Sequence, residues 1–231
     1  MNSLLLFFLA AIIFIIWRSS RNSKRGSFRT PIPEADAHKH GHRCYVDGLS
    51  VSEKEVVSAL AHGLSYRDYF IFNNLTLPAS NNGSTQIDHV VISKFGIFVV
   101  ESKNYKGWIF GSVDGKVWTQ SLPGGRKFTF QNPIHQNWAH IMALKELMPF
   151  VGDNFRNLVV FSERCEFKTP RIENVLFIHE LPASIKKSES VRLDESTLLL
   201  AIGKLSYLCQ AADISASQHI SNIQTAFAER S

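Results

Sequence analysis

Cysteine is scarce in this chain of 231 residues, and that scarcity excludes some kinds of protein. Cys44, Cys165 and Cys209 lie far apart, and no C-x-x-C pair occurs in the sequence. A cysteine-built zinc site is therefore excluded. The spacing also predicts no disulfide framework, which suits a reducing compartment. Low-complexity tracts are absent too, and 45% of the residues are hydrophobic, so the composition predicts a folded core.

An excess of one charge is likewise missing from most of the chain. The formal net charge is +5, but residues 18–43 hold seven cations and two anions. Residues 44–231 hold 18 cations and 18 anions. A basic balance can indicate a nucleic-acid or membrane partner. Because the whole excess lies in residues 18–43, bulk charge says nothing about what the following domain binds.

A long hydrophobic run stands at the N-terminus, where Leu4 to Trp17 reads LLLFFLAAIIFIIW. Counted from Met1 it has 17 residues, the lower end of the roughly 17–25 that span a membrane. Cations follow the run and none precedes it, which argues against a cleaved signal peptide. We expect residues 1–17 to be a transmembrane anchor in a bacterial-type cell membrane. The N-terminus would lie outside and the remaining chain in the cytoplasm, joined by a basic flexible tether over residues 18–43.

Residues 44–231 are expected to form one α/β domain, a mixed sheet flanked by helices. The first helix is predicted over residues 52–64, with Ser52 as the N-cap and Glu55 completing a capping box. Further helices are predicted over residues 132–148, 195–209 and 215–230. Strands of the same sheet are predicted over residues 69–77, 86–92, 97–103, 107–113, 117–120, 158–162 and 175–178.

Two of these strands carry charges within apolar stretches, in QIDHVVISKFGIFVVESK at residues 86–103. A four-residue loop between them would pair Ile92 with Ile97. The same register places Asp88 directly opposite Glu101, with both side chains on one face of the sheet.

Lys103 shares that face, because it lies two residues after Glu101 on the same strand. Two neighbouring carboxylates repel each other unless a cation lies between them. A structural salt bridge from Lys103 would neutralise one carboxylate and leave the other unmatched. A divalent ion fits better, since Mg²⁺ takes oxygen ligands and often binds only one or two carboxylates. Both interpretations remain open at this point.

The spacing of Asp88, Glu101-x-Lys103 and a glutamate on the preceding helix resembles the PD-(D/E)xK nuclease core. The run TQIDHVVISKFGIFVVESKNYKGWIFGS, then WTQ at residues 118–120 and NPIHQN at residues 132–137, resembles the nuclease-related domain (NERD) family more closely. The resemblance spans about residues 52–148. It implies a restriction-endonuclease-like core that hydrolyses phosphodiester bonds of DNA, or alternatively RNA, with Mg²⁺ or Mn²⁺.

The resemblance also assigns roles residue by residue. It implies that Asp88 and Glu101 bind the metal and that Lys103 is catalytic, with accessory roles for Glu53, Gln120 and Gln136. The two amides are equally well explained as caps of backbone groups at the ends of their elements.

Several neighbouring residues have simpler explanations. His89 is expected to be a hydrogen-bonded core histidine. Trp108, Trp118 and Trp138 are expected to pack in the interior and not to stack on bases. Residues 104–106 are placed to touch a phosphate backbone, but as turn residues they need no such role.

The sequence thus predicts a single-pass, membrane-anchored nuclease with nucleic acid as its partner. One rival is a binding or regulatory module that keeps the fold without turnover. A weaker rival is a membrane-attached scaffold for protein partners.

Overall fold

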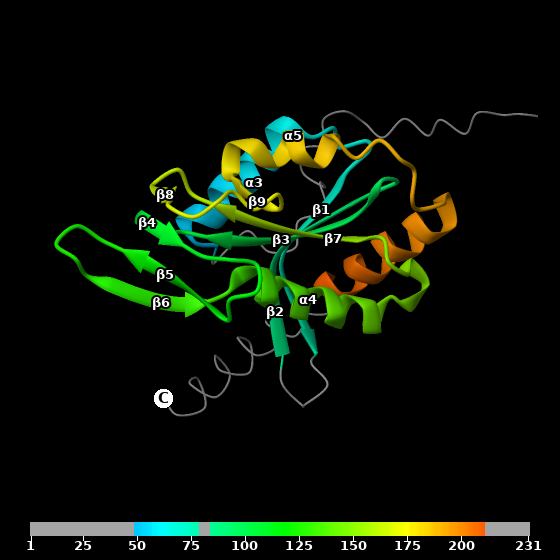
Figure 1. Ribbon diagram of the computed structural model, residues 1–231. Helices are drawn as coiled ribbons and strands as arrows, with labels where there is room; N and C mark the ends of the chain where they lie inside the picture. The colour runs from blue at the N-terminus through cyan, green and yellow to red at the C-terminus, as the bar shows by residue number, and fades with distance from the viewer. Residues whose placement is uncertain (1–48, 79–83, 211–231) are drawn as a thin grey trace, which may run out of the picture. The chain divides into compact units, whose positions relative to one another are not determined.

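A computed structural model describes residues 49–78 and 84–210 (Figure 1). The predicted anchor, the tether and the last predicted helix at residues 215–230 lie outside these residues. Within the two described ranges, no helix is long and apolar enough to cross a membrane.

The described chain is a mixed α/β domain with two sheets, each of which combines parallel and antiparallel pairs. The large sheet has the strand order β1-β2-β3-β7-β9, and the small sheet has the order β6-β5-β4-β8. The large sheet comprises β1 (Phe70–Pro78), β2 (Ser84–Ser93), β3 (Gly96–Lys103), β7 (Phe155–Phe161) and β9 (Val175–Phe177). The small sheet comprises β4 (Gly107–Phe110), β5 (Val117–Ser121), β6 (Lys127–Gln131) and β8 (Cys165–Phe167).

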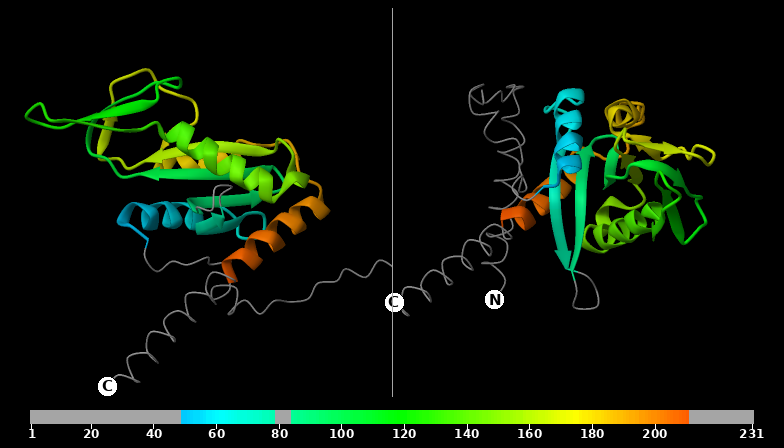
Figure 2. Two further views of the ribbon diagram at one scale, coloured as in Figure 1. Left: turned by 90° about the horizontal axis from the view of Figure 1, so that it is seen from below. Right: turned by 90° about the vertical axis from the view of Figure 1, so that its left-hand side faces the viewer.

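Helices cover both faces of the large sheet, as the views in Figures 1 and 2 show. On one face, α3 (Val51–Gly63) and α5 (Leu181–Lys186) pack against apolar side chains such as Val91, Phe98 and Val100. On the other face, α4 and a helix over residues 195–210 pack against side chains such as Val90 and Val99. The helices and short 3-10 turns are α3 (Val51–Gly63), α4 (Pro133–Leu147), η1 (Pro149–Val151), η2 (Ile178–Glu180) and α5 (Leu181–Lys186).

The start of α3 differs from the prediction, and the difference bears on the site. The N-cap is Ser50 and not Ser52, and the capping box is completed by Glu53 and not Glu55. Both pairs have the same three-residue spacing. Ser52 instead lies buried in the first turn, where its side chain cannot cap the helix. The prediction of the capping pair was therefore wrong by two residues.

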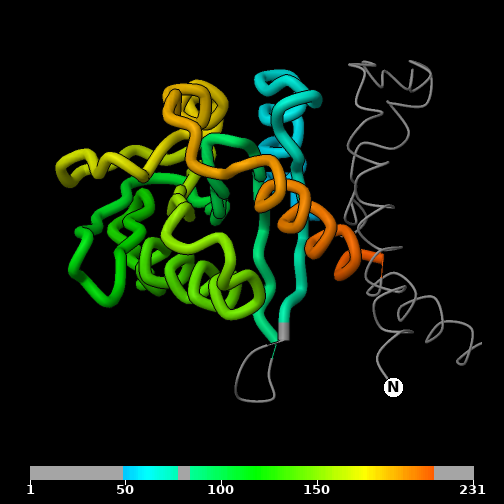
Figure 3. The backbone as a smooth tube through the Cα atoms, turned by 90° about the vertical axis from the view of Figure 1, so that its right-hand side faces the viewer, coloured from blue at the N-terminus to red at the C-terminus, as the bar shows by residue number. Residues whose placement is uncertain are grey.

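The predicted register of the β2–β3 hairpin is confirmed from Ile92–Ile97 to His89–Val100. Pairing continues to Ser93–Gly96, so the turn itself has two residues, and Gly96 adopts a φ of 131° that favours glycine. The strands predicted near residues 158–162 and 175–178 join the large sheet as β7 and β9. Figure 3 shows the β1–β2 ribbon running on past the other strands.

We had expected the strands after Lys103 to continue the large sheet. They form a second, small sheet instead. The chain leaves β3 through residues 104–106 and enters β4 of the small sheet. It leaves the neighbouring strand β7 in a similar way and enters β8. Since β3 and β7 are parallel neighbours, β4 and β8 become parallel neighbours as well. An apolar cluster that includes Trp118 and Phe161 joins the small sheet to β7.

The cysteines differ in state. Cys165 is free and buried, and burial raises the pKa of its thiol to about 11. It therefore lacks the thiolate character that a nucleophile needs. Cys209 is disulfide-bonded, a bond that the wide spacing of the cysteines did not predict.

Candidate active site

Asp88 lies where β2 and β3 separate. The pairing of the two strands ends at His89–Val100, one residue before Asp88 and Glu101 would meet. One carboxylate oxygen of Asp88, Oδ2, instead accepts hydrogen bonds from the backbone N–H of Ser102 at 2.8 Å and from its hydroxyl at 2.9 Å. The carboxylate thus occupies a position that a strand carbonyl would take in a continuing ladder. The predicted direct pairing is replaced by a side-chain contact across the opening.

The environment of Asp88 raises the pKa of its carboxyl from the usual 3.8 to about 6. Burial is the largest cause, and the negative charge of Glu101 adds to it. The hydrogen bonds from Ser102 act in the opposite direction, because they stabilise the charged form. The two carboxylates are therefore close enough to repel each other, as the sequence predicted.

Glu101 is almost fully buried and has a cationic partner. Nζ of Lys103 lies 2.6 Å from Oε1 of Glu101 and 3.0 Å from Oε1 of Gln136, on α4. Although burial opposes ionisation of Glu101, contacts with His140 and Lys103 hold its carboxyl pKa below the usual range. Lys103 thus neutralises Glu101 and leaves Asp88 without a cationic partner among these side chains.

His140 completes the cluster, and the sequence analysis missed it. Its Nε2 lies 3.3 Å from Oε2 of Glu101, in an orientation too poor for a full hydrogen bond. Its Nδ1 lies 2.9 Å from Oγ1 of Thr85 on β2. A proton on Nε2 would face the carboxylate and leave Nδ1 to accept from the threonine hydroxyl. The available signal was the spacing of four residues from Gln136, which places both side chains on one face of α4.

A buried amide holds α4 against the large sheet. Nδ2 of Asn137 donates to the carbonyls of Val99 at 2.8 Å and of Leu158 at 3.0 Å. These carbonyls belong to β3 and β7, so one side chain joins the helix to both strands. Asn137 immediately follows Gln136, and this anchor therefore sets where Gln136 meets Lys103.

The other two predicted site residues have structural partners. Oε2 of Glu53 accepts from the backbone N–H of Ser50 at 2.5 Å, as the capping box requires. The charge of Glu53 still contributes to the raised pKa of Asp88, so its carboxylate lies within electrostatic reach of the cluster. On β5, the amide of Gln120 donates to the carbonyl of Lys106 at 2.8 Å, which holds the segment that follows β3.

His89 is a core histidine, as predicted. It is fully buried, and its Nδ1 lies 2.8 Å from Oδ1 of Asn73. Burial lowers its pKa to about 4, which keeps the ring neutral. Trp118 packs in the interior as expected, but Trp108 and Trp138 are about half exposed. The expectation of packing was therefore wrong for those two tryptophans.

The two carboxylates fit a divalent cation, although the described part of the chain holds no conventional metal-binding cluster. Among the described residues, no three His, Cys, Asp or Glu side chains gather in a metal-binding arrangement. Mg²⁺ often uses only one or two carboxylates and completes its shell with water. Oε2 of Glu101 is buried and makes no hydrogen bond of good geometry, although Nε2 of His140 lies 3.3 Å from it. The ionised form of Asp88 is disfavoured by burial and by a like charge. A cation shared by the two carboxylates would give Oε2 of Glu101 a partner. It would also offset the repulsion that disfavours the ionised form of Asp88.

Comparison with known proteins gives the following relationships. The model of the nuclease-related domain family matches residues 49–162. An uncharacterised protein of Bacillus anthracis is 34% identical over 148 residues, which are 61% of this chain and 67% of that protein. The probable kinase PglW of Streptomyces coelicolor is 31% identical over 64 residues, which are 28% of this chain and only 4% of that protein. No solved structure matches.

Proposed function

Because this chain belongs to the nuclease-related domain family, we propose that it hydrolyses phosphodiester bonds of nucleic acid, foremost DNA, with Mg²⁺ or Mn²⁺ held by Asp88 and Glu101. The observation that carries this proposal is the uneven charge of the cluster. Lys103 neutralises Glu101, whereas the pKa of Asp88 is raised to about 6 beside it. A purely structural ion pair would not need Asp88, a second, partly buried carboxylate beside Glu101. We propose in addition that the large sheet and its helices form a restriction-endonuclease-like core.

Each member of the cluster then has a role. A bound divalent ion would polarise a phosphoryl oxygen and lower the pKa of a water ligand. Oε2 of Glu101 and the carboxylate of Asp88 would hold it. Nζ of Lys103 would supply an ammonium group that stabilises the negative charge developing on the phosphate. Gln136 accepts from Nζ at 3.0 Å and so fixes the direction of the lysine side chain.

His140 and Thr85 act as positioning residues. His140 contacts Oε2 of Glu101 and is itself held through Nδ1 by Thr85. The imidazole therefore limits the rotation of the Glu101 carboxylate while Lys103 holds its other oxygen. A carboxylate held from both sides needs little reordering when it binds a cation.

We propose that the N-terminal run anchors this domain to the cell membrane, with the domain on the cytoplasmic side. The support is the apolar run at residues 1–17 and the cations that follow it. The tether over residues 18–43 would let the domain reach nucleic acid beside the membrane.

The test is a cleavage assay on the full-length chain with labelled DNA and RNA oligonucleotides, in Mg²⁺, Mn²⁺ or EDTA. We expect cleavage that EDTA abolishes and that Glu101→Gln and Lys103→Ala each reduce by at least about 100-fold. Asp153→Asn is the matched control, because Asp153 is an exposed carboxylate that also pairs with a lysine, Lys145. Binding without cleavage in every metal would overturn the proposal and favour the non-catalytic module.

A further inference from the structure

The small sheet has one face turned to solvent, and that face carries two aromatic side chains. Along β4 the side chains alternate, so that Ile109 is buried while Trp108 and Phe110 are 51% and 37% exposed. On β5, Trp118 is buried beneath the sheet with Ile109. A solvent-facing strand surface usually carries polar residues, so two adjacent exposed aromatic rings need an explanation.

The neighbours of these rings on β5 leave them partly exposed. Trp108 is paired across the strands with Ser121, and Phe110 is paired with Thr119. Both partners are small, so they cannot cover an aromatic ring. On β8, Glu166 pairs with Trp108 and forms an ion pair with Lys168 at 2.5 Å. Nζ of Lys168 lies over one face of the Trp108 ring, 4.9 Å from its centre, so a base would stack on the exposed remainder of the ring. We call these residues, together with Lys127 of β6, the outer face of the small sheet. Lys127 pairs with Ser121 of β5.

The segment that forms three of the four strands of the small sheet carries an excess of positive charge, and the outer face itself has Lys127 and Lys168 against Glu166. Residues 104–131, which contain β4, β5 and β6, hold four cations and a single anion. The whole stretch over residues 44–231 is balanced, with 18 of each sign. Exposed aromatic rings bordered by lysines complement a chain that has both flat bases and phosphates. A protein partner would match the rings but would not explain the excess of cations.

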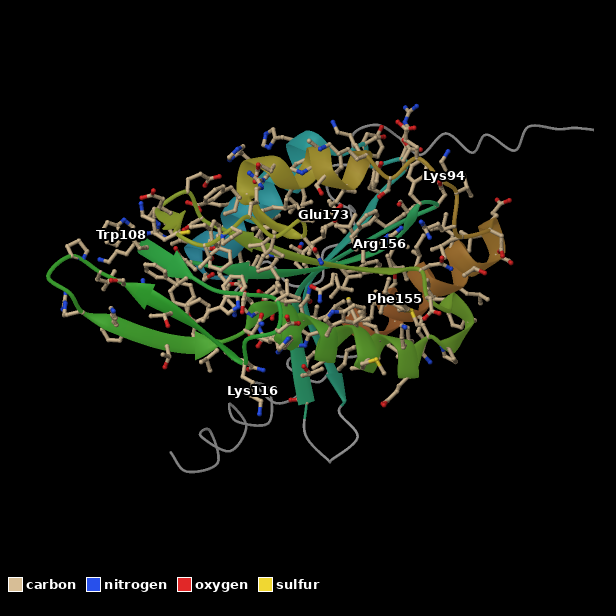
Figure 4. All side chains as sticks on the ribbon, in the orientation of Figure 1. Lys94, Trp108, Lys116, Phe155, Arg156 and Glu173 are labelled. Carbon is tan, nitrogen blue, oxygen red and sulfur yellow. The ribbon has the colours of Figure 1, made fainter. Side chains whose placement is uncertain are left out.

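The outer face is joined to the proposed catalytic cluster by a short, fixed segment. Lys103 ends β3, and only residues 104–106 separate it from β4. Gln120 holds the carbonyl of Lys106, and Arg164 contacts the side chain of Asn104. Figure 4 shows Trp108 at the end of the described domain that the small sheet forms. A strand bound there can continue along residues 104–106 toward Lys103.

We propose that the outer face of the small sheet binds single-stranded nucleic acid by stacking bases on Trp108 and Phe110. Lys127 and Lys168 contact the phosphates of the same strand. The consequence for cleavage rests on the function proposed above, but the binding itself does not. Cleavage would therefore favour substrates with unpaired bases, because the rings of a duplex are already stacked on one another.

Binding is measured in EDTA, where no metal-dependent cleavage occurs, by the anisotropy of a labelled single-stranded oligonucleotide added to the full-length chain. Loss of one base–aromatic contact is expected to weaken binding by about 5- to 150-fold. We expect this loss for Trp108→Ala and for Phe110→Ala. Lys127→Ala should lower the slope of log K against log salt by about 0.7.

Trp138→Ala is the matched control, because Trp138 is 46% exposed but lies on α4. It should bind the oligonucleotide as the wild type does. Equal binding by wild type and Trp108→Ala would overturn the inference, and so would equal losses in Trp108→Ala and Trp138→Ala. Cleavage in Mg²⁺ that neither aromatic substitution changes would overturn it while leaving the proposed function intact. Binding that depends on Trp108 without any cleavage would support the outer face and contradict the nuclease function.

Discussion

Replacing Asp88 by asparagine should stabilise the metal-free protein, because it removes a carboxylate that the folded state disfavours. The pKa of Asp88 rises from the usual 3.8 to about 6 on folding. At 1.36 kcal/mol for each pH unit, keeping this group ionised at pH 7 costs about 3 kcal/mol. Asparagine can still accept from Ser102 through its carbonyl oxygen. We therefore expect Asp88→Asn to raise the melting temperature in EDTA at pH 7, with an upper limit of about 6–12 °C.

The direction of the pKa shift of Asp88 determines how the stabilisation by Asp88→Asn depends on pH. Because the pKa in the folded state is the higher one, the folded state binds the proton more tightly than the unfolded chain does. The free-energy cost of keeping Asp88 ionised in the folded state is therefore absent below about pH 4 and complete above about pH 6. The difference in melting temperature between Asp88→Asn and wild type should therefore grow between pH 4 and pH 6.

Melting curves in EDTA at several pH values provide the measurement, with Asp153→Asn as the control. Asp153 is fully exposed, and its ion pair with Lys145 lowers the pKa of its carboxyl, so this substitution should give no gain. An Asp88→Asn protein that melts at or below the wild-type temperature at every pH would refute the reasoning.

Three further outcomes follow from the same contacts. Gln136→Leu should lower the cleavage rate while the melting temperature changes little, since it frees Nζ of Lys103 from one of its two partners; a rate equal to wild type would contradict this. Thr85→Val removes the partner of His140 Nδ1 and should weaken Mn²⁺ binding up to about 10-fold, as a calorimetric titration would show; unchanged affinity would argue against a positioning role. Deleting residues 1–17 should release the domain from the membrane fraction without changing its melting temperature, and a deleted chain that still sediments with membranes would contradict the anchor.

The sequence predicted the hairpin well because its two strands are strongly apolar and their register depends on one short turn. Asp88 was placed near Glu101 for that reason. The end of the ladder could not be predicted, because it depends on the carboxylate of Asp88 reaching the backbone of Ser102. That contact competes with ordinary strand pairing and leaves no periodic signal.

His140 and the small sheet were missed for a different reason. His140 joins the site only because Asn137 anchors α4 across β3 and β7, and such tertiary contacts have no local pattern. The strands after Lys103 have the composition of ordinary strands, so the sequence predicted their type but not that they would form a second sheet. For the same reason the exposure of Trp108 became evident only with the structure.

The measurement that tests the central claim most directly is a titration of the full-length chain with Mn²⁺. The concentration of free Mn²⁺ is read at each step from its electron paramagnetic resonance signal. The account predicts that wild type binds the ion and that Lys103→Ala still binds it. It also predicts that Asp88→Asn and Glu101→Gln each bind it at least about 10-fold more weakly. Wild type that does not bind Mn²⁺, or binding that neither carboxylate substitution weakens, would contradict the claim that these two carboxylates hold a metal ion.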